Sequence, residues 1–542
     1  MYIPSAIILG LLGQATSSYV WPSKYDHLED LLAMHSGYLR FGFSDLVVPC
    51  GFGSGLPGVQ NAAEWVRSVF HDIATFDAST GVGGLDASLQ FELDRPENVG
   101  SAFNNTFAAM YDFITPQSSV SDLLALSLVA ALAACDGPKV PLRAGRVDAT
   151  EAGPAGVPKP EDDLESTRKA FLRAGFNDED MITMVACGHS LGNVHSVNFP
   201  ELVSGEATEE NVAPFDSSPT NFDNTVVTEY LDDSTSNPLI VGANDTMKSD
   251  KRVFGADGNA TMSALADPAN FQAKCADIFE RMLDTVPSTV TLSDPIEIVD
   301  VKPYIDPLHL QEDGSVLLQG RVRVRNNPEQ KINGDDLEVS LSYRDLSGAS
   351  ISEPVVANRA RARGGQSFGF WDNTFTWFEF SQSLNATASI RDFDIHLKTS
   401  SSGALLVLDN EGTGGYAVTS DLLYQQPESC LINNGAAMAL SVTAALRKDL
   451  VDANSPPVLH LAHRVARPGV MLPRLQLETI AFELIPGVEK SGYQYFRANA
   501  TVEASGWSTT FDIEAGAGTG GKVHRLELLK TNALSDTCGS IS

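Results

Sequence analysis

The sequence lacks three features that would assign it to large classes of protein. It has 37 lysines and arginines against 69 aspartates and glutamates, a formal net charge of −32 at pH 7. Binding to nucleic-acid phosphates needs a basic surface, so this balance argues against a nucleic-acid partner. No apolar run is long enough to cross a bilayer, and the six cysteines include no CxxC pair of the kind that holds zinc. We therefore expect a globular protein with neither a nucleic-acid nor a membrane partner.

The N-terminus indicates export. Residues 1–18 contain an apolar run of about ten residues that ends in small residues, as in a signal peptide, although no basic residue precedes it. Five Asn-X-Ser/Thr triplets agree with export; they start at Asn104, Asn244, Asn259, Asn385 and Asn499. An even number of cysteines suits disulfides in an exported chain, with the pairing left open. We expect a secreted, extracellular glycoprotein that loses residues 1–18.

The hydrophobic pattern divides the chain near residues 287–295. Upstream, stretches such as 119–135, 163–175, 177–191 and 269–286 have helical periodicity and capping residues. Downstream, residues 316–325, 337–343, 475–484 and 493–502 alternate with the period of strands. A chain of 542 residues is also too long for one ordinary core. The expected fold is multidomain: a mainly α-helical domain over 19–290, then an all-β region over 291–542 with one or two sandwich-like units.

The stretch 64–72 (EWVRSVFHD) predicts a helix that carries chemistry. Arg67 and His71 are four residues apart and therefore share one helix face. A neutral imidazole there could take a proton from one peroxide oxygen and return it to the other, while a guanidinium stabilises the developing charge. An ordinary helix with a surface arginine and a hydrogen-bonded histidine explains the same pattern, and without other evidence it is the simpler interpretation.

A second histidine lies near the end of the predicted helix 177–191. His189 is followed far downstream by Asp250 in the stretch MKSD. A histidine that ligates iron normally donates its other N–H to a carboxylate or carbonyl group. Asp250 is the candidate acceptor, and it would make His189 a stronger electron donor to the iron.

Four blocks in this order resemble the fungal secreted (class II-like) haem peroxidases of the plant peroxidase superfamily. They are Arg67-x-x-Phe70-His71-Asp72, Gly188-His189-Ser190, residues 214–224 (PFDSSPTNFDN) and Lys248-Ser249-Asp250. The resemblance implies a haem b cofactor with His189 as its axial ligand and Asp250 as the acceptor behind it. It makes His71 and Arg67 the catalytic pair and Asn98 the amide that orients His71. Phe70 and Phe215 would contact the haem, Phe215 at a position where some intracellular relatives have tryptophan.

The resemblance also implies two calcium ions. The distal site would consist of Asp72, Gly84, Asp86 and Ser88, and the proximal site of Ser190, Asp216, Ser218, Asn221 and Asp223. Carboxylate, carbonyl and hydroxyl oxygens are suitable ligands for a hard cation.

Several positions depart from specialised members of the family. Manganese-oxidising members have three acids at the haem edge, whereas this chain has Glu64 with Gln60 and His195. Met184 stands where lignin-oxidising members have a surface tryptophan. The family's disulfide pattern is not evident, and Cys187 is interpreted as a buried helix residue, with a bridge as the alternative. These departures favour a general peroxidase that uses hydrogen peroxide to oxidise small phenol-like donors by one-electron steps.

Two other functions remain as alternatives. Gly188-His189-Ser190-Leu191-Gly192 is also a G-x-S-x-G pattern, in which Ser190 would be an esterase nucleophile. That motif needs a strand before it and a helix after it, whereas residues 177–188 have the capping pattern of a helix. The chain could also be a peroxidase-like but non-catalytic protein that binds the cell wall.

The C-terminal region carries no catalytic motif. Its aromatic run over 368–380 is interpreted as sandwich core rather than as a sugar-binding platform. His460 and His463 have no partner ligands nearby in the sequence, so we expect no metal there. Cys430 and Cys538 are candidates for a bridge, and a polysaccharide or cell-wall partner is left open for this region.

Overall fold

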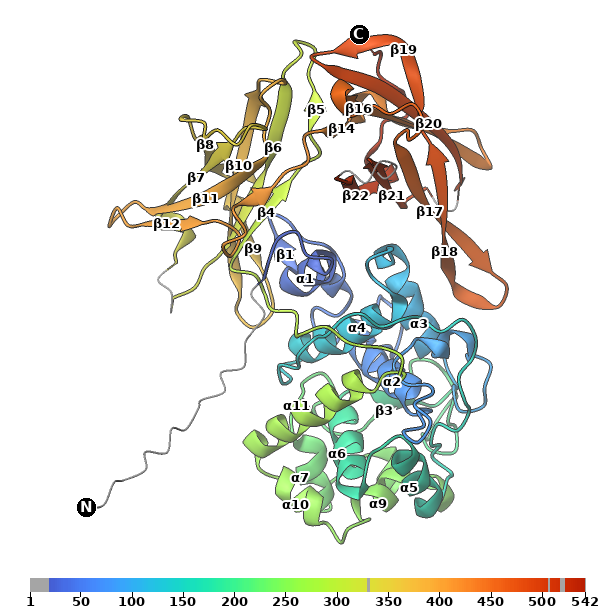
Figure 1. The fold of residues 1–542 in the computed structure, drawn as a ribbon. Helices are drawn as coiled ribbons and strands as arrows, with labels where there is room; N and C mark the ends of the chain where they lie inside the picture. Colours follow the sequence, from blue (N-terminus) through green and yellow to red (C-terminus); the bar gives the residue numbers. More distant parts are fainter. Residues whose placement is uncertain (1–18, 329–331, 505–506, 517–521, 542) are drawn as a thin grey trace, which may run out of the picture.

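The computed structural model describes residues 19–328, 332–504, 507–516 and 522–541, and it consists of a helical part followed by a β part (Figure 1). The α-helices are α1 (Asp26–Ala33), α2 (Asn61–Ile73), α3 (Ala102–Met110), α4 (Val120–Ala134), α5 (Leu164–Arg173), α6 (Asp178–Gly188), α7 (Thr225–Leu231), α8 (Pro238–Val241), α9 (Ser249–Phe254), α10 (Ala260–Leu265) and α11 (Pro268–Asp284). Within these residue ranges, no helix is both long and apolar enough to cross a membrane.

The helical part is organised around α4. Every residue from Val120 to Leu132 is buried, as a helix without a polar face requires. Its N-cap is Ser119, whose side chain accepts a hydrogen bond from the backbone N–H of Asp122. Helix α2 packs against α4, and α6 packs against α11. The helix expected over 119–135 is therefore confirmed and lies at the centre of the domain.

Helix α6 ends earlier than its sequence pattern indicates. Asn177 and Asp180 form a reciprocal capping box at its start, as the acidic first turn suggests. The helix stops at Gly188, so His189 is its C-cap and the predicted continuation to Leu191 is wrong. The chain turns there because Gly192, with φ +90°, donates its backbone N–H to the carbonyl of Pro219.

The β part contains two antiparallel units. Its strands begin with β4 (Val301–Ile305), β5 (His309–Leu310), β6 (Val316–Arg325), β7 (Leu337–Arg344), β8 (Val355–Arg359), β9 (Gln366–Phe368), β10 (Thr374–Leu384), β11 (Asp392–Thr399), β12 (Leu405–Leu408) and β13 (Tyr416–Ala417). Together with β1 (Ser36–Gly37) these form an eleven-stranded sheet within the described residues. Side chains from β6 and β10 share one core with side chains from β7 and β11.

The second unit consists of two sheets around another core. Its strands are β14 (Leu422–Tyr424), β15 (Cys430–Asn433), β16 (Ala437–Arg447), β17 (Val458–Arg467), β18 (Val470–Ala481), β19 (Glu483–Lys490), β20 (Tyr493–Glu503), β21 (Thr510–Ala515) and β22 (His524–Lys530). One sheet has the order β14-β16-β20-β19, with β15 beside β16, and the other has the order β18-β17-β21-β22. The expected fold class, a helical domain followed by an all-β region, is confirmed.

Local differences from the expected strands have simple causes. The stretch 475–484 is divided between β18 and β19, because Phe482 leaves the strand pattern and is buried in the second core. In the aromatic run, Phe375, Trp377, Phe378 and Phe380 are buried, so the interpretation as core is correct for β10. Phe368, in contrast, is exposed.

The N-terminal segment joins the two parts of the molecule. Strand β1 pairs with β9, and Ser36 lies opposite Phe368. In α1, Leu28 and Leu31 are buried in the helical core, while Glu29 and Asp30 face Lys302 of β4. Helix α1 thus belongs to the interior of both parts. The short strands β2 (Asn193–His195) and β3 (Val212–Pro214) pair with each other inside the helical part.

Three disulfides use all six cysteines. They join Cys50 to Cys135, Cys187 to Cys275, and Cys430 to Cys538. Cys187 is a buried residue of α6, as interpreted, and the alternative of a bridge is also correct, because α11 brings Cys275 against α6. The expected bridge between Cys430 and Cys538 is present.

Candidate active site

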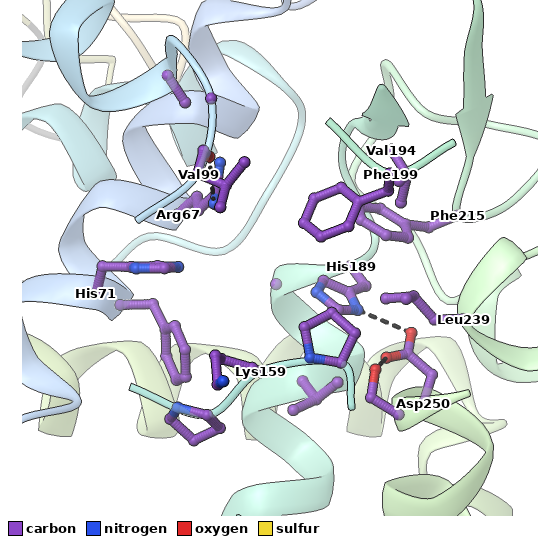
Figure 2. A pocket seen from close by; sticks show the side chains of 18 of the residues that line it. Arg67, His71, Val99, Lys159, His189, Val194, Phe199, Phe215, Leu239 and Asp250 are labelled. Carbon is purple, nitrogen blue, oxygen red and sulfur yellow. Dashed lines mark hydrogen bonds and ion pairs between the residues drawn. The ribbon is translucent and has the colours of Figure 1, made fainter. Parts of the chain in front are cut away.

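A cavity of about 600 Å³ lies within the helical part. Arg67, Phe70 and His71 of α2 line one wall, and His189 at the end of α6 lines another. Figure 2 shows the two imidazoles on opposite sides of this space. The two histidines, 118 positions apart in the numbering of the chain, are therefore brought to one cavity by the packing of α2 and α6 in one domain.

The ring of His71 is oriented by Asn98. The Nδ1 atom of His71 lies 2.8 Å from Oδ1 of Asn98, and Nδ2 of Asn98 donates to the carbonyl of Glu92 at 2.9 Å. Because the amide nitrogen is used by Glu92, the amide oxygen must accept a proton from Nδ1 of His71. The lone pair of the imidazole is therefore on Nε2. Burial and the nearby charge of Arg67 lower the pKa of His71 to about 3, so the ring is neutral at ordinary pH.

Arg67 lies one helical turn before His71. Its guanidinium donates to the carbonyl of Val99 at 3.0 Å and stacks on the ring of Phe103 at 4.6 Å. Burial lowers its pKa to about 10, so the side chain remains a cation. A fixed positive charge beside a neutral base can stabilise negative charge that develops on a nearby oxygen.

His189 is held from behind by a carboxylate. Its Nδ1 atom lies 2.8 Å from Oδ2 of Asp250, a residue that is 1% exposed. Its ring stacks on Phe215, with 4.2 Å between centroids and 7° between planes. Since Nδ1 donates to Asp250, Nε2 is the nitrogen left for a ligand.

Sequence reasoning missed Asn237, a completely buried residue. Its Nδ2 donates at 2.8 Å to the Oδ2 atom of Asp250 that also accepts from His189. Its Oδ1 caps α8 by accepting from the backbone N–H of Leu239 at 2.8 Å. An Asn-Pro pair in the sequence indicates a helix start, but nothing in it points to Asp250.

The donor set fits a haem. A haem-ligating histidine needs a free nitrogen toward the cofactor and an acceptor behind the ring, and His189 has both. Apolar side chains complete the cavity walls, among them Phe70, Phe199, Phe215 and Leu239. Across the cavity from His189, Nε2 of His71 is not used by Asn98.

The residues expected to bind calcium gather at two places. On the distal side, Oδ2 of Asp72 accepts from the backbone N–H of Asp86 at 2.9 Å, and Oγ of Ser88 is buried without a partner. Gly84, with φ +102°, brings the chain back toward Asp72. Burial together with the charge of Asp86 raises the pKa of Asp72 well above its usual value.

On the proximal side, Asp216 and Asp223 share Ser218. The backbone N–H of Ser218 donates to Asp216 at 2.8 Å, and its hydroxyl donates to Asp223 at 3.0 Å. Asn221 donates to Asp223 at 2.7 Å, and Oδ2 of Asp216 is buried without a partner. Among the residues that the structure describes, no group of three or more His, Cys, Asp or Glu side chains is arranged to hold a metal, at these two places or around His460 and His463.

The positions that differ from specialised peroxidases also line the cavity. Gln60 donates to the carbonyl of Cys50 at 3.3 Å, and Glu64 accepts from Asn105 at 2.9 Å. Burial raises the pKa of Glu64 to about 7. His195 lies 3.6 Å from Glu209, and Met184 is buried in the wall rather than placed at the surface.

The geometry does not favour the esterase alternative. Ser190 follows a helix instead of a strand, and the short strand β2 comes after it. Its side chain is completely buried and donates to the carbonyl of Asp223 at 2.8 Å. A nucleophile elbow needs the opposite order of elements and an exposed hydroxyl.

Comparisons with known proteins agree with this geometry. The model of the Peroxidase family matches residues 57–268. A WSC domain-containing protein of Arthroderma benhamiae is 38% identical over 384 residues, which cover 70% of this chain and 52% of the relative. The peroxisomal L-ascorbate peroxidase 5 of Arabidopsis thaliana is 31% identical over 168 residues, or 31% of this chain and 56% of that protein. The mitochondrial cytochrome c peroxidase of Aspergillus fumigatus is 33% identical over 165 residues, or 29% of this chain and 42% of that protein.

These matches define the part of the chain to which the similarity applies. The chain spans about half the length of the curated relatives it matches, and the two relatives named as peroxidases align with less than a third of it. The similarity to peroxidases concerns residues 57–268, and these matches do not place the chain in the fungal secreted group. Residues 57–268 form a peroxidase-family domain, and an antiparallel β region follows it.

Proposed function

We propose that the chain is a secreted haem peroxidase that uses hydrogen peroxide to oxidise small phenol-like donors by one-electron steps. One observation carries this proposal. His71 and His189 line the same cavity, and each has its Nδ1 atom fixed by a partner, Asn98 and Asp250 respectively. Both rings therefore have Nε2 available, one as a base and one as a ligand.

Three residues of the chain would have separate roles in the reaction with peroxide. His189 would hold the iron through Nε2, and bound haem would supply the two electrons that reduce peroxide to water and recover them singly from two donor molecules. Nε2 of His71 would take a proton from one peroxide oxygen and deliver it to the other, which leaves as water. Arg67 would stabilise the negative charge on the departing oxygen.

Substitution of His71 tests the proposal directly. In the haem-loaded protein, His71→Ala should keep the haem absorption spectrum but slow the reaction with peroxide by at least about 100-fold, because the proton carrier is missing. Ser190→Ala should still bind haem and react with peroxide, even if loss of a proposed calcium ligand lowers the rate, whereas an esterase would lose its nucleophile and all esterase activity. An unchanged peroxide rate in His71→Ala would exclude His71 as the acid–base.

Calcium is part of the proposal. The oxygen atoms of Asp72, Asp86 and Ser88 converge on the distal side, and Ser88 Oγ has no protein partner there. On the proximal side, Asp216 Oδ2 is likewise buried without a partner, beside Ser218 and Asp223. Oxygen ligands of this kind suit Ca²⁺, which would satisfy atoms that the protein leaves unpaired.

Export and a partner for the β region are also part of the proposal. The signal-like residues 1–18 lie outside the described residues, so the support for secretion is the sequence pattern and the three disulfides. A polysaccharide or cell-wall partner for the β region is supported only by the long alignment with the Arthroderma protein named for a WSC domain. Recovery of the protein from culture medium, followed by sedimentation with cell-wall polysaccharide, tests both points.

A further inference from the structure

The hairpin of β17 and β18 reaches beyond its own sheet to the helical domain. Figure 1 shows it extending toward α3, and β18 contacts α3 and the 3₁₀ turn η2 (Ser88–Phe91). Leu472 of β18 is 0% exposed and lies in the hydrophobic core of the helical domain. The C-terminal region thus contributes a side chain to the core of the peroxidase domain.

Two arginines of β17 attach the hairpin to this domain. Arg464 donates to the carbonyls of Tyr111 and Ile114 and stacks on the ring of Tyr111 at 5.0 Å. Arg467 is held on its own hairpin by the carbonyl of Leu472, at 2.9 Å from Nη2 and 3.1 Å from Nε.

Arg467 also contacts η2 in two ways. Its Nη2 atom donates to Oε1 of Gln90, and its guanidinium lies over the ring of Phe91 at 5.0 Å. Gln90 is 1% exposed, so this contact lies in the interior between the two parts of the molecule. Arg467 therefore ties the hairpin to the segment that follows α2.

Gln90 connects this contact to Asp72, the residue that follows His71. Its Nε2 atom donates to the carbonyl of Ala87 at 2.9 Å, and the backbone N–H of Ala87 donates to Asp72 at 2.7 Å. Ala87 has φ +60°, a conformation that a non-glycine residue keeps only when its surroundings hold it. Asp72 in turn accepts the backbone N–H of Leu89 at 2.9 Å.

A second connection leads to the His71 ring. Phe91, under the Arg467 guanidinium, is followed by Glu92, whose carbonyl accepts the Nδ2 hydrogen of Asn98. Asn98 holds Nδ1 of His71. The hairpin thus contacts the segment that supports both the backbone beside His71 and the amide that orients its ring.

We propose that the β17–β18 hairpin is a positioning element of the peroxidase site, in which Arg467 and Leu472 hold residues 86–92 in the conformation that orients His71. The inference rests on the proposed function, because His71 is the residue that is positioned. It makes the β region a required part of the enzyme, rather than an appendage that only binds a partner.

Amide hydrogen exchange tests the contact without any turnover. In Arg467→Ala, the backbone amides of Asp86, Ala87 and Leu89 should exchange at least about tenfold faster, while the amides of α4 keep their protection. Arg474→Ala is the matched control, since Arg474 lies on the same hairpin and its exposed side chain donates to Gln476 at 3.3 Å rather than to the helical domain, as far as the described residues show. Gln90→Met removes the same contact from the other side and serves if Arg467→Ala does not fold.

A second experiment measures the rate constant for the reaction of the haem-loaded protein with peroxide. Arg467→Ala and Gln90→Met should each lower the rate constant for reaction with peroxide about tenfold, with haem affinity unchanged, because His71 is misplaced rather than lost. The double variant should be no slower than the single variants, and Arg467→Lys should recover part of the rate by keeping a donor to Gln90.

The outcomes separate this inference from the proposed function. Faster exchange together with a slower peroxide reaction supports it. Unchanged exchange, or faster exchange with an unchanged peroxide rate, overturns it while the peroxidase function stands. If the unsubstituted protein bound haem but did not react with peroxide, the proposed function would be wrong. A positioning role for that reaction would then be wrong as well. The exchange data would still show whether the hairpin holds residues 86–92.

Discussion

The side-chain amide of Asn237 donates a hydrogen bond from Nδ2 to Oδ2 of Asp250 at 2.8 Å in the interior. The same oxygen accepts the hydrogen bond from Nδ1 of His189. The amide therefore fixes the direction in which that oxygen points. A carboxylate oriented in this way keeps the proton of His189 on Nδ1.

Asn237→Leu should weaken this support without removing the ligand. We expect haem affinity or peroxide turnover to fall by about 10-fold, and Asp250→Asn to have a larger effect because it removes the negative charge behind His189. The reduction potential of bound haem should rise in Asp250→Asn. Potentiometric titration and haem-binding titration measure these effects, and Asn532→Leu on the β region is the control. Equal potentials in Asp250→Asn and the unsubstituted protein would contradict the role of Asp250.

Asn98→Leu should separate the orientation of His71 from its chemistry. The variant keeps the imidazole but loses the acceptor at Nδ1, so we expect the peroxide reaction to slow by about 10-fold or more, less than in His71→Ala. Stopped-flow absorption gives the rate constant. Asn270→Leu, on an exposed turn of α11, should leave it unchanged. A loss as large as that of His71→Ala would mean that Asn98 does more than orient the ring.

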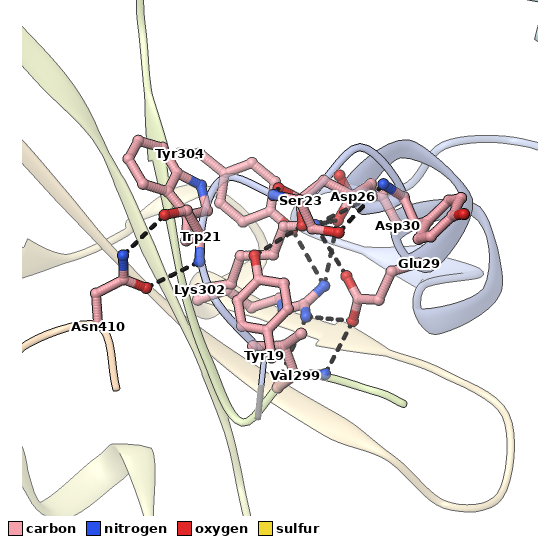
Figure 3. A network of polar contacts seen from close by, with 12 residues as sticks. Tyr19, Trp21, Ser23, Asp26, Glu29, Asp30, Val299, Lys302, Tyr304 and Asn410 are labelled. Carbon is pink, nitrogen blue, oxygen red and sulfur yellow. Dashed lines mark hydrogen bonds and ion pairs between the residues drawn. The ribbon is translucent and has the colours of Figure 1, made fainter. Parts of the chain in front are cut away.

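The charge cluster between α1 and the β part should control acid stability. Figure 3 shows Tyr19, Asp26, Glu29, Asp30, Lys302 and Tyr304 of this cluster close together. Arg323 of β6 completes the cluster through its ion pairs with Glu29 and Asp30. Although burial raises it, Arg323 and Lys302 lower the pKa of Glu29 to about 2, below its usual 4.5. Burial raises the pKa of Asp30 to about 6.

The signs of these two shifts are opposite. Because the pKa of Glu29 is lowered on folding, its contribution to the free energy of unfolding is complete above pH 4.5 and is lost as the pH falls toward 2. Because the pKa of Asp30 is raised, its ionisation opposes folding as the pH rises from 3.8 to about 6. Denaturant unfolding between pH 2 and pH 7 should therefore show a loss of stability at the acid end that is smaller in Glu29→Gln, where the other carboxylates with lowered pKa values remain.

Glu29→Gln should also be strongly destabilising at neutral pH. It leaves the buried Arg323 and Lys302 with less negative charge, which costs about 3–5 kcal/mol in comparable sites. Glu338→Gln, which breaks the exposed pair with Lys398, should change stability little, because water screens that pair. Similar losses in the two variants would show that the buried cluster has no special role.

Chelation should destabilise the helical domain, because it removes the two proposed calcium ions. A ligand present at 100 times its dissociation constant stabilises the folded state by about 2.7 kcal/mol, so its removal should lower the midpoint of thermal unfolding measurably. Asp216→Asn should reduce the effect of the chelator, and Asp512→Asn on the β region should not. A midpoint that does not respond to chelator or to added Ca²⁺ would contradict both sites.

The disulfide between Cys187 and Cys275 should matter for both stability and the haem. It closes a separation of 88 residues and ties α6, two positions before His189, to α11. Replacing both cysteines with alanine should lower the free energy of unfolding by about 2–4 kcal/mol and broaden the haem absorption band. Loss of the Cys430–Cys538 bridge in the β region should destabilise without altering the haem spectrum.

Local sequence was sufficient for the elements whose stability is local. The starts of α4 and α6 follow from the N-caps Ser119 and Asn177, whose side chains cap the backbone within three residues. The shared face of Arg67 and His71 follows from helical periodicity, and the alternation in β6 follows from a sheet with one buried face. The assignment of His189 and Asp250 to one site needed the resemblance between motifs, since no local rule links them.

Only the tertiary structure could reveal the contacts between distant segments. Four contacts join residues whose local sequences do not indicate the partner. They are Asn237 with Asp250, Cys187 with Cys275, Glu29 with Arg323, and Arg467 with Gln90. The amino-acid sequence by itself determined the helical and β parts of the chain and the residue types of the haem site. Packing decided how that site is supported, because hydrogen bonds and burial between distant segments depend on where the whole chain places them rather than on neighbouring residues.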